Sequence, residues 1–592
     1  MRTTSKQSRG LLLWLMAVLA LTGIGVSVAG APARAAEITC FVHDADTTYR
    51  IVPRAGVVRV DVAFTARNRC RDYALVGWFV GGIPSTARKV RVSGSGVSVK
   101  SSDRDGEWMT YEVGFPRVLP GGRKRFRMTY EIPNGLPHEW HQVVLRDEYW
   151  HLCWTGHPAE TGTTKVVFPG RRKPQTYLGT VKTKRHGDSV TVTAVRTRDP
   201  GSLGLCTDVF DTQRQVVSRV ESDGGGSVLI RGWASDPAWS TSVERSVSNV
   251  LPRLEAIFGT PISTRREIKV QQVAVRTLEG YAGTHYRGGY IRLAADADDS
   301  QLVAHEIAHE WASERHFEPV WLQEGIADWA ANQAAGQGVC TRPASYPGKG
   351  QPRLAKWVYL DERPTRRQEA IVDYQYDAAC YVMTRMAWTI GRERMTEVIQ
   401  ALLQGRSPYD GSPRTKRQKR EPADWREWLD AVDELGLVPA GREDLEYAER
   451  FTTEFGIGGK KALKGRRAAR ADYHELLAQI GGLQAPLVVR DHMDAWRFKE
   501  ARQAIGLARG VGSLVAELET CAGDDAAGSI AALAERYAQA ASVRVLKRLR
   551  ADVRELAAED RPCDAADVPP ETERPPLSPA EPETTLEPVP AA

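Results

Sequence analysis

The sequence predicts a multidomain α+β protein, in which an N-terminal antiparallel β-sandwich-like domain precedes a mostly helical domain and a C-terminal helical region. The chain has 592 residues, too many for a single hydrophobic core, so several domains are expected. Apolar and polar residues alternate in the first third of the sequence, whereas helical spacing prevails beyond Ser300. The hydrophobic content of 42% and the charged content of 26% are ordinary for folded soluble proteins.

The N-terminus has the pattern of a secretory signal. Arg2, Lys6 and Arg9 precede an uncharged, largely apolar stretch from Leu11 to Gly30, and the small-x-small sequence Ala33–Ala35 follows as a cleavage site. The apolar stretch is also just long enough to span a bilayer as an uncleaved anchor, and only in that case is a membrane association expected. Either outcome predicts a secreted or extracytoplasmic protein of the cell envelope.

The segment from about Glu37 to Thr212 is predicted to form antiparallel strands. Apolar residues alternate with polar ones through Val58–Ala66 and again through Phe126–Ile132, which is the period of a half-buried strand. A β-sandwich or saddle-like sheet is therefore expected. Further short runs of this kind, separated by turn-forming residues, are Lys89–Val92, Lys165–Phe168 and Ser189–Val195.

The period changes after the glycines at 224–226. Val243–Phe258 is amphipathic, although Pro252 should kink or split a helix there, and the Gly-Thr-Pro sequence that follows is a helix-stop signal. Strands are expected at Ile268–Val275 and Tyr290–Ala294, and mainly helices from Ser300 to about Leu435. Leu514–Leu518 and Ile530–Leu556 are the clearest helical stretches beyond that point.

These changes of pattern divide the chain. The last segment is rich in Pro, Glu and Thr and is expected to be a disordered tail. The predicted parts are a signal peptide at 1–35, an antiparallel β domain at 36–215, a mostly helical domain at 228–440, a helical region at 441–566 and the tail at 567–592.

The cysteines suit an oxidising compartment, because there are eight of them, an even number. No pair has CxxC spacing, which argues against a thiolate zinc site or a redox motif. Consecutive pairing is favoured because each pair then falls inside one predicted domain, and four disulfides are expected. The candidates are Cys40, Cys70, Cys153, Cys206, Cys340, Cys380, Cys521 and Cys563.

The charge balance gives no sign of nucleic-acid binding, since Lys and Arg (80) nearly balance Asp and Glu (74). Basic residues gather locally in Arg414–Arg420 and Lys460–Arg470. We interpret these runs as solvated loops or helix faces, with a patch for an anionic envelope component or substrate as the alternative.

The segment Leu302–Trp311 contains an HExxH motif, and it follows three residues suited to a helix N-terminus, Asp298, Asp299 and Ser300. On a helix, His305 and His309 project from one face and can reach the same metal ion. Neutral imidazole is a good zinc ligand, and Glu306 beside it can take a proton from a metal-bound water. Because short motifs of this kind also arise by chance, this one needs support from elsewhere in the chain.

That support comes from Trp321–Trp329, which has the pattern of a buried helix carrying an acidic residue, Glu324. A buried carboxylate is costly unless it is paired or bound to a metal. Zinc supplies that partner, and His305, His309 and Glu324 would form a His2Glu site with one position open for water. The sequence therefore predicts a catalytic Zn2+ site.

These two segments, VAHEIAHEW and WLQEGIADW, resemble the gluzincin metallopeptidases of the peptidase MA type. That thermolysin and aminopeptidase N-like group has HExxH followed by a downstream Glu in a WLxEGxA-like helix. The likeness covers Tyr290–Trp329 and continues more loosely to about Leu403. It implies a thermolysin-like, mostly helical catalytic domain at 228–440, zinc ligands at His305, His309 and Glu324, and a general base at Glu306.

The resemblance assigns three further roles. Tyr376, in the segment YDAAC, matches the tyrosine that stabilises the transition state in the family, with Tyr374 as the nearby alternative and packing alone as another. Asp328 matches an acid that orients a zinc histidine, here His305, although a surface or capping role stays open. The segment Gly288–Leu293 falls where these families place an edge strand that pairs with extended substrate.

The region before the motif departs from the aminopeptidases of this group. Thr284–Asp299 contains no GAMEN-type segment and no evident equivalent of its amine-binding glutamate. The sequence therefore predicts a secreted zinc metallopeptidase that acts on peptide or protein substrates as an endopeptidase more than as an aminopeptidase. Two alternatives stay open: a zinc amidase acting on cell-wall peptides, and a catalytically idle, zinc-containing binding or scaffold protein of the cell envelope.

Overall fold

The computed structural model divides the chain into two compact units. The first contains residues 1–404, 417–425 and 454–457, and the second contains residues 405–416, 426–453 and 458–592. Among the described residues, no helix is both long and apolar enough to cross a membrane. The signal segment, the tail, the basic run at 414–420 and Cys563 lie outside those residues. The structure describes residues 40–157, 159–170, 172–177, 181–195, 204–262, 266–278, 280–336, 340–344, 346, 350–360, 365–409, 411, 421–437, 447–521 and 527–559.

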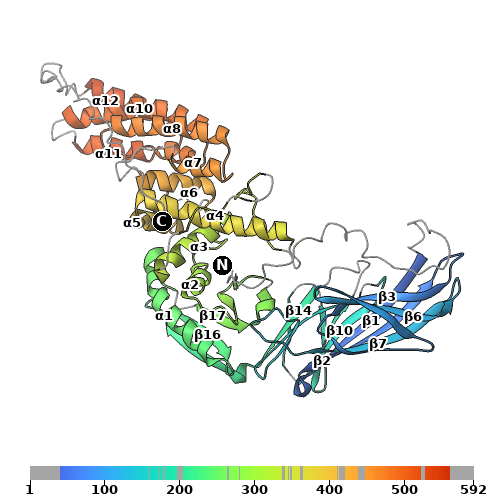
Figure 1. The fold of residues 1–592 in the computed structure, drawn as a ribbon. Helices are drawn as coiled ribbons and strands as arrows, with labels where there is room; N and C mark the ends of the chain where they lie inside the picture. The colour runs from blue at the N-terminus through green and yellow to red at the C-terminus, as the bar shows by residue number, and fades with distance from the viewer. Residues whose placement is uncertain are drawn as a thin grey trace, which may run out of the picture. The chain divides into compact units, whose positions relative to one another are not determined.

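The first unit begins with a seven-stranded sheet of order β12-β13-β10-β1-β2-β7-β4. Four of its strands, β10, β1, β2 and β7, are labelled in Figure 1. All neighbours are antiparallel except β1 and β10, which run parallel. The predicted alternation places Val58, Val60, Val62 and Phe64 in the core. The strands are β1 (Phe41–Val52), β2 (Val57–Asn68), β4 (Arg88–Ser93), β7 (Arg123–Pro133), β10 (Thr163–Pro169), β12 (Val181–His186) and β13 (Ser189–Val195).

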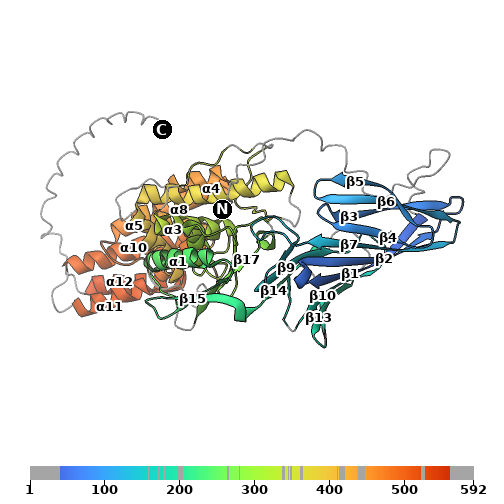
Figure 2. The same cartoon turned by 60° about the horizontal axis from the view of Figure 1, so that its bottom comes forward.

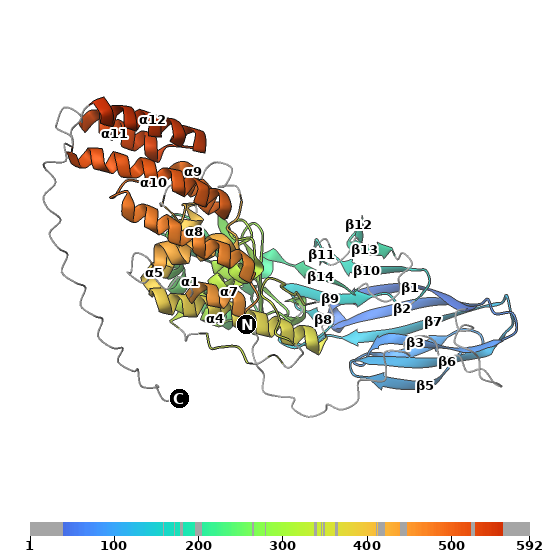
Figure 3. The ribbon, with the colours of Figure 1, turned by 90° about the horizontal axis from the view of Figure 1, so that it is seen from above.

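A three-stranded sheet, β3 (Leu75–Pro84), β6 (Trp108–Val118) and β5 (Ser98–Asp105), lies along the large sheet (Figures 2 and 3). The two sheets share one apolar core, and the predicted division into an N-terminal β part and a helical C-terminal part is confirmed. A further sheet has the order β11-β14-β9-β8. Its strands are β8 (Val143–Leu145), β9 (Tyr149–Thr155), β11 (Gln175–Tyr177) and β14 (Gly204–Phe210).

The middle of the first unit contains a mixed five-stranded sheet of order β15-β16-β17-β19-β18. The three central strands are parallel, and β18, at one edge, pairs antiparallel with β19. The expectation of an edge strand at Gly288–Leu293 is therefore wrong, because β19 lies between β17 and β18 and the edge is formed by β18. The predicted strand at 268–275 ends at Val273, because Val275–Leu278 forms a 3-10 turn. The strands are β15 (Gln215–Glu221), β16 (Ser227–Trp233), β17 (Glu267–Val273), β18 (Gly283–Tyr286) and β19 (Tyr290–Ala294).

Helix α1 (Pro237–Phe258) connects β16 to β17 and ends at Gly259, as predicted. Pro252 was expected to kink or split this helix, and the split is wrong, because α1 is one continuous helix. Val247, Leu251 and Leu254, on both sides of the proline, are fully buried on one face. This packing keeps the helix continuous through the proline, since tertiary contacts outweigh local propensity.

Four more helices complete the first unit: α2 (Ser300–Ala308), α3 (Val320–Ala335), α4 (Arg366–Ile390) and α5 (Arg392–Leu403). The Asp299 side chain caps α2 by accepting a hydrogen bond from the Gln301 backbone N–H at 2.8 Å. The helix predicted to hold both motif histidines is shorter than expected. It ends at Ala308, so that His309 is the C-cap residue and the chain then turns.

The second unit is a helical bundle with its own apolar core. Arg466 and Arg470, one turn apart on α8, are fully buried, so the interpretation of Lys460–Arg470 as a wholly solvated face is wrong. Their guanidinium groups face the carboxylates of Asp430, Asp433 and Glu434 at 2.6–2.9 Å. The helices are α6 (Trp425–Ala431), a π-helical turn (Val432–Leu437), α7 (Tyr447–Glu454), α8 (Lys460–Gln479), α9 (Leu487–Asp494), α10 (Phe498–Cys521), α11 (Ala527–Ala538) and α12 (Val543–Glu559).

Candidate metal centre

Three predicted ligands, from two helices and a turn, converge on one point. His305 lies in the last turn of α2, His309 caps its end, and Glu324 lies in the first half of α3. The two Nε2 atoms are 3.1 Å apart. Glu324 Oε2 lies 3.3 Å from the Nε2 of His305 and 3.5 Å from that of His309.

These separations suit a tetrahedral zinc ion. Bonds of about 2.0–2.1 Å place the corners of a tetrahedron roughly 3.3 Å apart, and the three donor atoms form a triangle of that size. Glu324 Oε2 is also buried without a hydrogen-bond donor among the described residues. A metal cation bound between the three donor atoms would satisfy this buried oxygen. Two imidazoles and one carboxylate are the donor set of a catalytic zinc site with one open position.

A second layer of contacts orients both histidines. His305 Nδ1 lies 2.8 Å from Asp328 Oδ1, one turn after Glu324 on α3. His309 Nδ1 lies 3.0 Å from the Ala312 carbonyl oxygen, which the turn after α2 brings back toward the ring. In both rings Nε2 is left to face the ligand triangle, as second-layer partners do for metal-binding histidines.

The carboxylates around His305 also change its protonation in the metal-free protein. Burial lowers the pKa of His305, but Asp328 and Glu324 outweigh that effect and raise this pKa to about 10. Burial likewise opposes ionisation of Glu324, but the two histidines lower its pKa well below the usual range. The site therefore concentrates negative charge where a cation would bind.

Glu306 lies beside this triangle in a confined position. Its side chain is buried and lies against Gly283 on β18, the edge strand. A Cβ atom at Gly283 would meet Glu306 Oε1 at 2.5 Å and its Cγ at 2.7 Å. The absence of a side chain at Gly283 thus makes room for the carboxylate at this point of the wall.

The ligands and Glu306 line a cavity of about 590 Å3, and residues 283–285 of β18 form part of its wall. Tyr376 on α4 also lines it, whereas Tyr374 contacts Tyr346 elsewhere, with ring centroids 6.4 Å apart. Burial, and then the charge of Glu324, raise the pKa of Tyr376 well above its ordinary value. The Tyr376 hydroxyl therefore keeps its proton and can act as a hydrogen-bond donor.

A cluster of charged residues around Glu310 also lines this cavity, and it was not predicted from the sequence. This residue follows His309 directly and is buried. It forms an ion pair with Arg266, which precedes β17, and its Oε1 lies 2.8 Å from His285 Nε2 on β18. The extra acid after HExxH was the only sequence signal, and it did not indicate partners from two separate strands.

Helices α3 and α4 are held closely together behind the site. At Gly325, next to Glu324, a Cβ atom would meet the Ala379 carbonyl oxygen of α4 at 2.9 Å. The structure also joins Cys340 to Cys380, as consecutive pairing predicts, and forms the bridges Cys40–Cys70 and Cys153–Cys206 in the same way. The disulfide therefore joins the chain beyond α3, the helix of Glu324, to α4, the helix of Tyr376.

The chain is similar to solved zinc metallopeptidases. A mutant of the M1 zinc metallopeptidase from Deinococcus radiodurans, bound to the substrate Tyr-Ser-Ala, has 18% identity and a TM-score of 0.30, over 70% of this chain and 93% of that one. The M1 zinc metallopeptidase of the same organism has 16% identity and a TM-score of 0.31, over 70% and 93% of the two chains. No protein-family profile and no curated protein match the sequence.

Proposed function

We propose that this protein is an exported zinc metallopeptidase that cleaves peptide bonds in peptide or protein substrates as an endopeptidase. The observation that carries the proposal is the triangle of His305 Nε2, His309 Nε2 and Glu324 Oε2, with Glu306 beside it in the same cavity. A purely structural zinc site has no need of an open coordination position or of a neighbouring base.

In the proposed hydrolysis, the residues of the cavity have separate roles. Zinc, when bound, lowers the pKa of a water molecule and polarises the substrate carbonyl. Glu306 takes the proton from the attacking water and returns it to the leaving amine nitrogen. Tyr376 donates a hydrogen bond to the oxygen that gains negative charge. Asp328 keeps His305 in the orientation that leaves its Nε2 free for the metal.

The charges of the cavity favour an endopeptidase. An aminopeptidase needs a carboxylate to receive the free amine of its substrate. Among the described residues that line the cavity, Glu310 is occupied by Arg266 and His285, and Glu314 is occupied by Arg287. Glu324 and Glu306 serve the metal and the water. The edge of β18 offers backbone groups to an extended substrate strand instead.

Digestion of two matched peptide libraries tests this proposal, one with free N-termini and one N-acetylated. The full exported chain should cleave internal bonds in both libraries at similar rates, with products mapped by mass spectrometry. The Glu306→Gln variant is the control, since it should leave both libraries intact. Cleavage confined to the first residue of the free library would identify an aminopeptidase. Cleavage of cell-wall peptides alone would indicate the amidase, and no cleavage of any of these would indicate an idle scaffold.

Export is supported by the disulfides. The described residues of the first unit contain three, and such bonds persist in oxidising compartments outside the cytoplasm. Expression of the full chain with its N-terminal segment, followed by mass measurement of the protein from the medium and from the envelope, tests the predicted cleavage after Ala35. A chain retained in the cytoplasm would contradict the proposal.

A further inference from the structure

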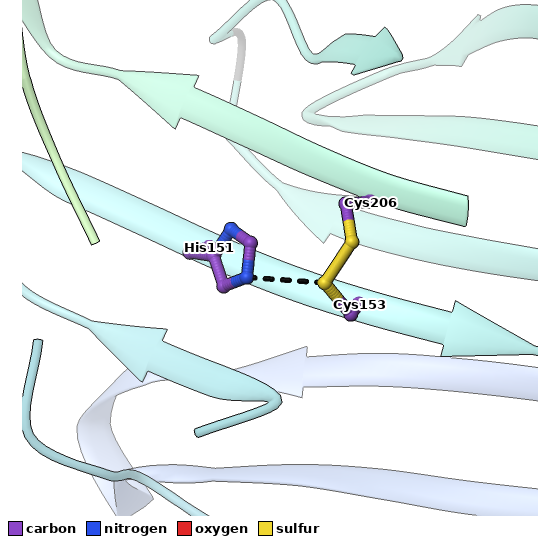
Figure 4. Close-up of side chains that lie close together, drawn as sticks. All are labelled: His151, Cys153 and Cys206. Carbon is purple, nitrogen blue, oxygen red and sulfur yellow. Dashed lines mark hydrogen bonds between the residues drawn. A yellow bond between two sulfur atoms is a disulfide. The ribbon is translucent and has the colours of Figure 1, made fainter. Parts of the chain in front are cut away.

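A second cluster of metal-binding side chains lies in the β region of the first unit. His151, Cys153 and Cys206 each present a ligand atom, and these atoms all lie within 4.8 Å of one another. Figure 4 shows the His151 ring directed at the sulfur of Cys153, which is joined to Cys206. His151 Nε2 lies 3.2 Å from Cys153 Sγ.

The side of His151 away from the sulfur is held by a buried carboxylate. His151 Nδ1 lies 2.9 Å from Asp208 Oδ1, and both residues are fully buried. The Tyr149 hydroxyl donates to the same Asp208 oxygen at 2.7 Å, and Thr277 Oγ1 lies 3.1 Å from His151 Nδ1. A carboxylate on Nδ1 places the proton there and directs the lone pair of Nε2 at the sulfur. Metal-binding histidines have this arrangement.

Strand pairing, and not only the disulfide, holds the two cysteines in place. Cys153 and Cys206 are direct partners on the antiparallel strands β9 and β14, which are paired at seven positions from Gly204↔Thr155 to Phe210↔Tyr149. Their Cα atoms are 4.0 Å apart. If the sulfur–sulfur bond is broken, the two thiols stay side by side, and the ring of His151 stays beside them.

The donors then match a thiophilic metal ion. Zinc–sulfur bonds of about 2.3 Å separate two thiolates by roughly 3.8 Å in a tetrahedron, a distance that neighbouring strands readily span. Cys153 is partly buried and Cys206 is buried. Two thiolates and one imidazole form a donor set that binds zinc more tightly than it binds hard cations.

We propose that Cys153, Cys206 and His151 form a redox-gated zinc site that is distinct from the site on α2 and α3. A dithiol reductant supplies two electrons and two protons to the disulfide, which becomes two thiols, while the dithiol itself becomes a disulfide. The ion then displaces both thiol protons into solvent and is held by two thiolates and His151 Nε2. In the reverse step the two thiolates reduce an external disulfide by thiol–disulfide exchange: the ion is released, the Cys153–Cys206 bond forms, and the external disulfide takes up the two electrons, and two protons from solvent, to become a dithiol.

Hydrogen bonds and strand pairing connect this cluster to the candidate active site. The network around Asp208 contacts the chain directly after β17 of the five-stranded sheet. The Tyr149 hydroxyl lies within hydrogen-bond distance of Thr277 Oγ1, at 2.9 Å, and accepts a hydrogen bond from the Ala274 backbone N–H at 3.3 Å. Arg292 on β19 lies 3.7 Å from Asp208 Oδ2. Strand β19 pairs with β18, the strand that lines the candidate active site.

Cobalt spectroscopy on the full chain tests the proposal, because thiolate ligands give Co2+ an intense near-ultraviolet charge-transfer band that a His2Glu site lacks. We expect Co2+ to give this band after reduction and not before it. The band should persist in His305→Ala and in the Cys40→Ser, Cys70→Ser pair. The band should vanish in the Cys153→Ser, Cys206→Ser pair. In His151→Gln, the apparent affinity for Co2+ measured from the band should fall at least tenfold. A band that survives loss of Cys153 and Cys206, or no band in reduced wild type, overturns the proposal.

Alkylation provides a second measurement that needs no variant. In reduced wild-type protein, Zn2+ should slow the reaction of iodoacetamide with Cys153 and Cys206 at least tenfold, as mapped by mass spectrometry. Cys40 and Cys70, which belong to neither group of three potential metal ligands found among the described residues, serve as the internal reference and should react at an unchanged rate. Equal rates with and without Zn2+ at all four cysteines would show that the reduced strands do not hold the ion.

Discussion

At the scale of single residues, the candidate zinc site separates ligands from the base. His305 and Glu324 each provide a corner of the ligand triangle, whereas Glu306 lies beside it. We expect the wild-type protein to hold about one zinc ion per chain in this site, and His305→Ala and Glu324→Ala to lose it. Elemental analysis of the oxidised proteins measures this, and full zinc occupancy in both variants would contradict the site.

Glu306→Gln should behave differently from the ligand variants. Because the amide has the same shape but cannot accept the proton, the variant should retain zinc and thermal stability while turnover falls by several orders of magnitude. Zinc content and kcat, measured on the same preparation, separate the two roles. Loss of zinc in this variant would show that Glu306 is a ligand and not the base.

Tyr376 can be tested against its neighbour. Removal of one oxyanion donor typically lowers kcat by roughly 10²–10³, so Tyr376→Phe should show a loss of that size with little change in KM. Tyr374→Phe is the matched control, because Tyr374 lies on the same helix but outside the cavity. An unchanged kcat in Tyr376→Phe would leave this residue a packing role only.

Gly283 tests the placement of the base without altering the base itself. The Cβ atom of Gly283→Ala would meet the end of the flexible Glu306 side chain, so the carboxylate should move while the fold survives. A displacement of about 1 Å can cost on the order of 10²-fold in rate. We expect kcat to fall while zinc content and Tm stay close to wild type. Wild-type kcat in this variant would show that Glu306 is not confined by β18.

The residues of this site were predictable to different extents. The ligands and Glu306 follow from the HExxH motif and the acidic residue of a second buried helix, Asp328 was implied by the family resemblance, and the structure brings all of them together. Glu310 was missed because its partners, Arg266 and His285, reach it only through the order of strands in the sheet. The cluster of His151, Cys153 and Cys206 was missed for the same reason, since its members meet through strand pairing and not through a CxxC motif.

At the scale of elements, local signals predicted which segments form helices and strands better than where they end. The period of Val58–Ala66 and Phe126–Ile132 predicted β2 and β7, because those strands bury alternate residues. The end of α2 at Ala308 was not predictable from the apolar residues that follow, which are buried in a turn instead. The unbroken α1 shows the same influence, since buried contacts on both sides of Pro252 outweigh its local effect.

The bridge between Cys340 and Cys380 yields a prediction at this scale. It links the chain just past α3 to α4, and Asn332 of α3 donates a hydrogen bond to Cys340 Sγ at 3.1 Å. Closing a loop between residues 40 positions apart is worth on the order of 3–4 kcal/mol in the chain-entropy model. The Cys340→Ser, Cys380→Ser pair should therefore unfold at lower temperature and lose activity, because Tyr376 is held less firmly near the zinc ligands.

Zinc should stay bound to this pair of variants at low temperature, since neither cysteine is a ligand. Metal content, Tm and kcat of the oxidised proteins measure the three effects. Non-reducing peptide mapping of the wild type supplies the control, because a cross-linked peptide containing Cys340 and Cys380 must be present. A free thiol at either position, or an unchanged kcat in the double variant, would rule out the positioning role.

At the scale of the whole molecule, the two units obtain their stability in different ways. The first is built on apolar sheets and disulfides. The second buries Arg466 and Arg470 among carboxylates in a helical bundle. The sequence predicted the helices of the second unit, but it could not show that two residues of a basic run face inward, because their partners lie some 36 residues earlier in the chain.

The charge network of the second unit predicts how its stability depends on pH. Burial raises the pKa of Asp433 to about 6, although Arg466 and Arg470 act to lower it, against an ordinary value of 3.8. Folded Asp433 therefore binds a proton more tightly than unfolded Asp433 does. Its contribution to stability is fully present below about pH 4 and is lost as the pH rises through about 6. At about 1.4 kcal/mol per pKa unit, the loss is on the order of 2–3 kcal/mol.

Asp433→Asn removes this titrating group and should remove that component of the pH dependence. The free energy of opening of α8 is measured by amide hydrogen exchange at about pH 4 and about pH 6.5. Between these values it should fall more in wild type than in Asp433→Asn. Asp472→Asn is the matched control, because Asp472 lies on the outer face of α8 in a surface ion pair with Arg502 and should follow wild type. Parallel pH profiles for wild type and Asp433→Asn would mean that Asp433 stays ionised in the folded bundle, so that its two arginines fully offset the cost of its burial.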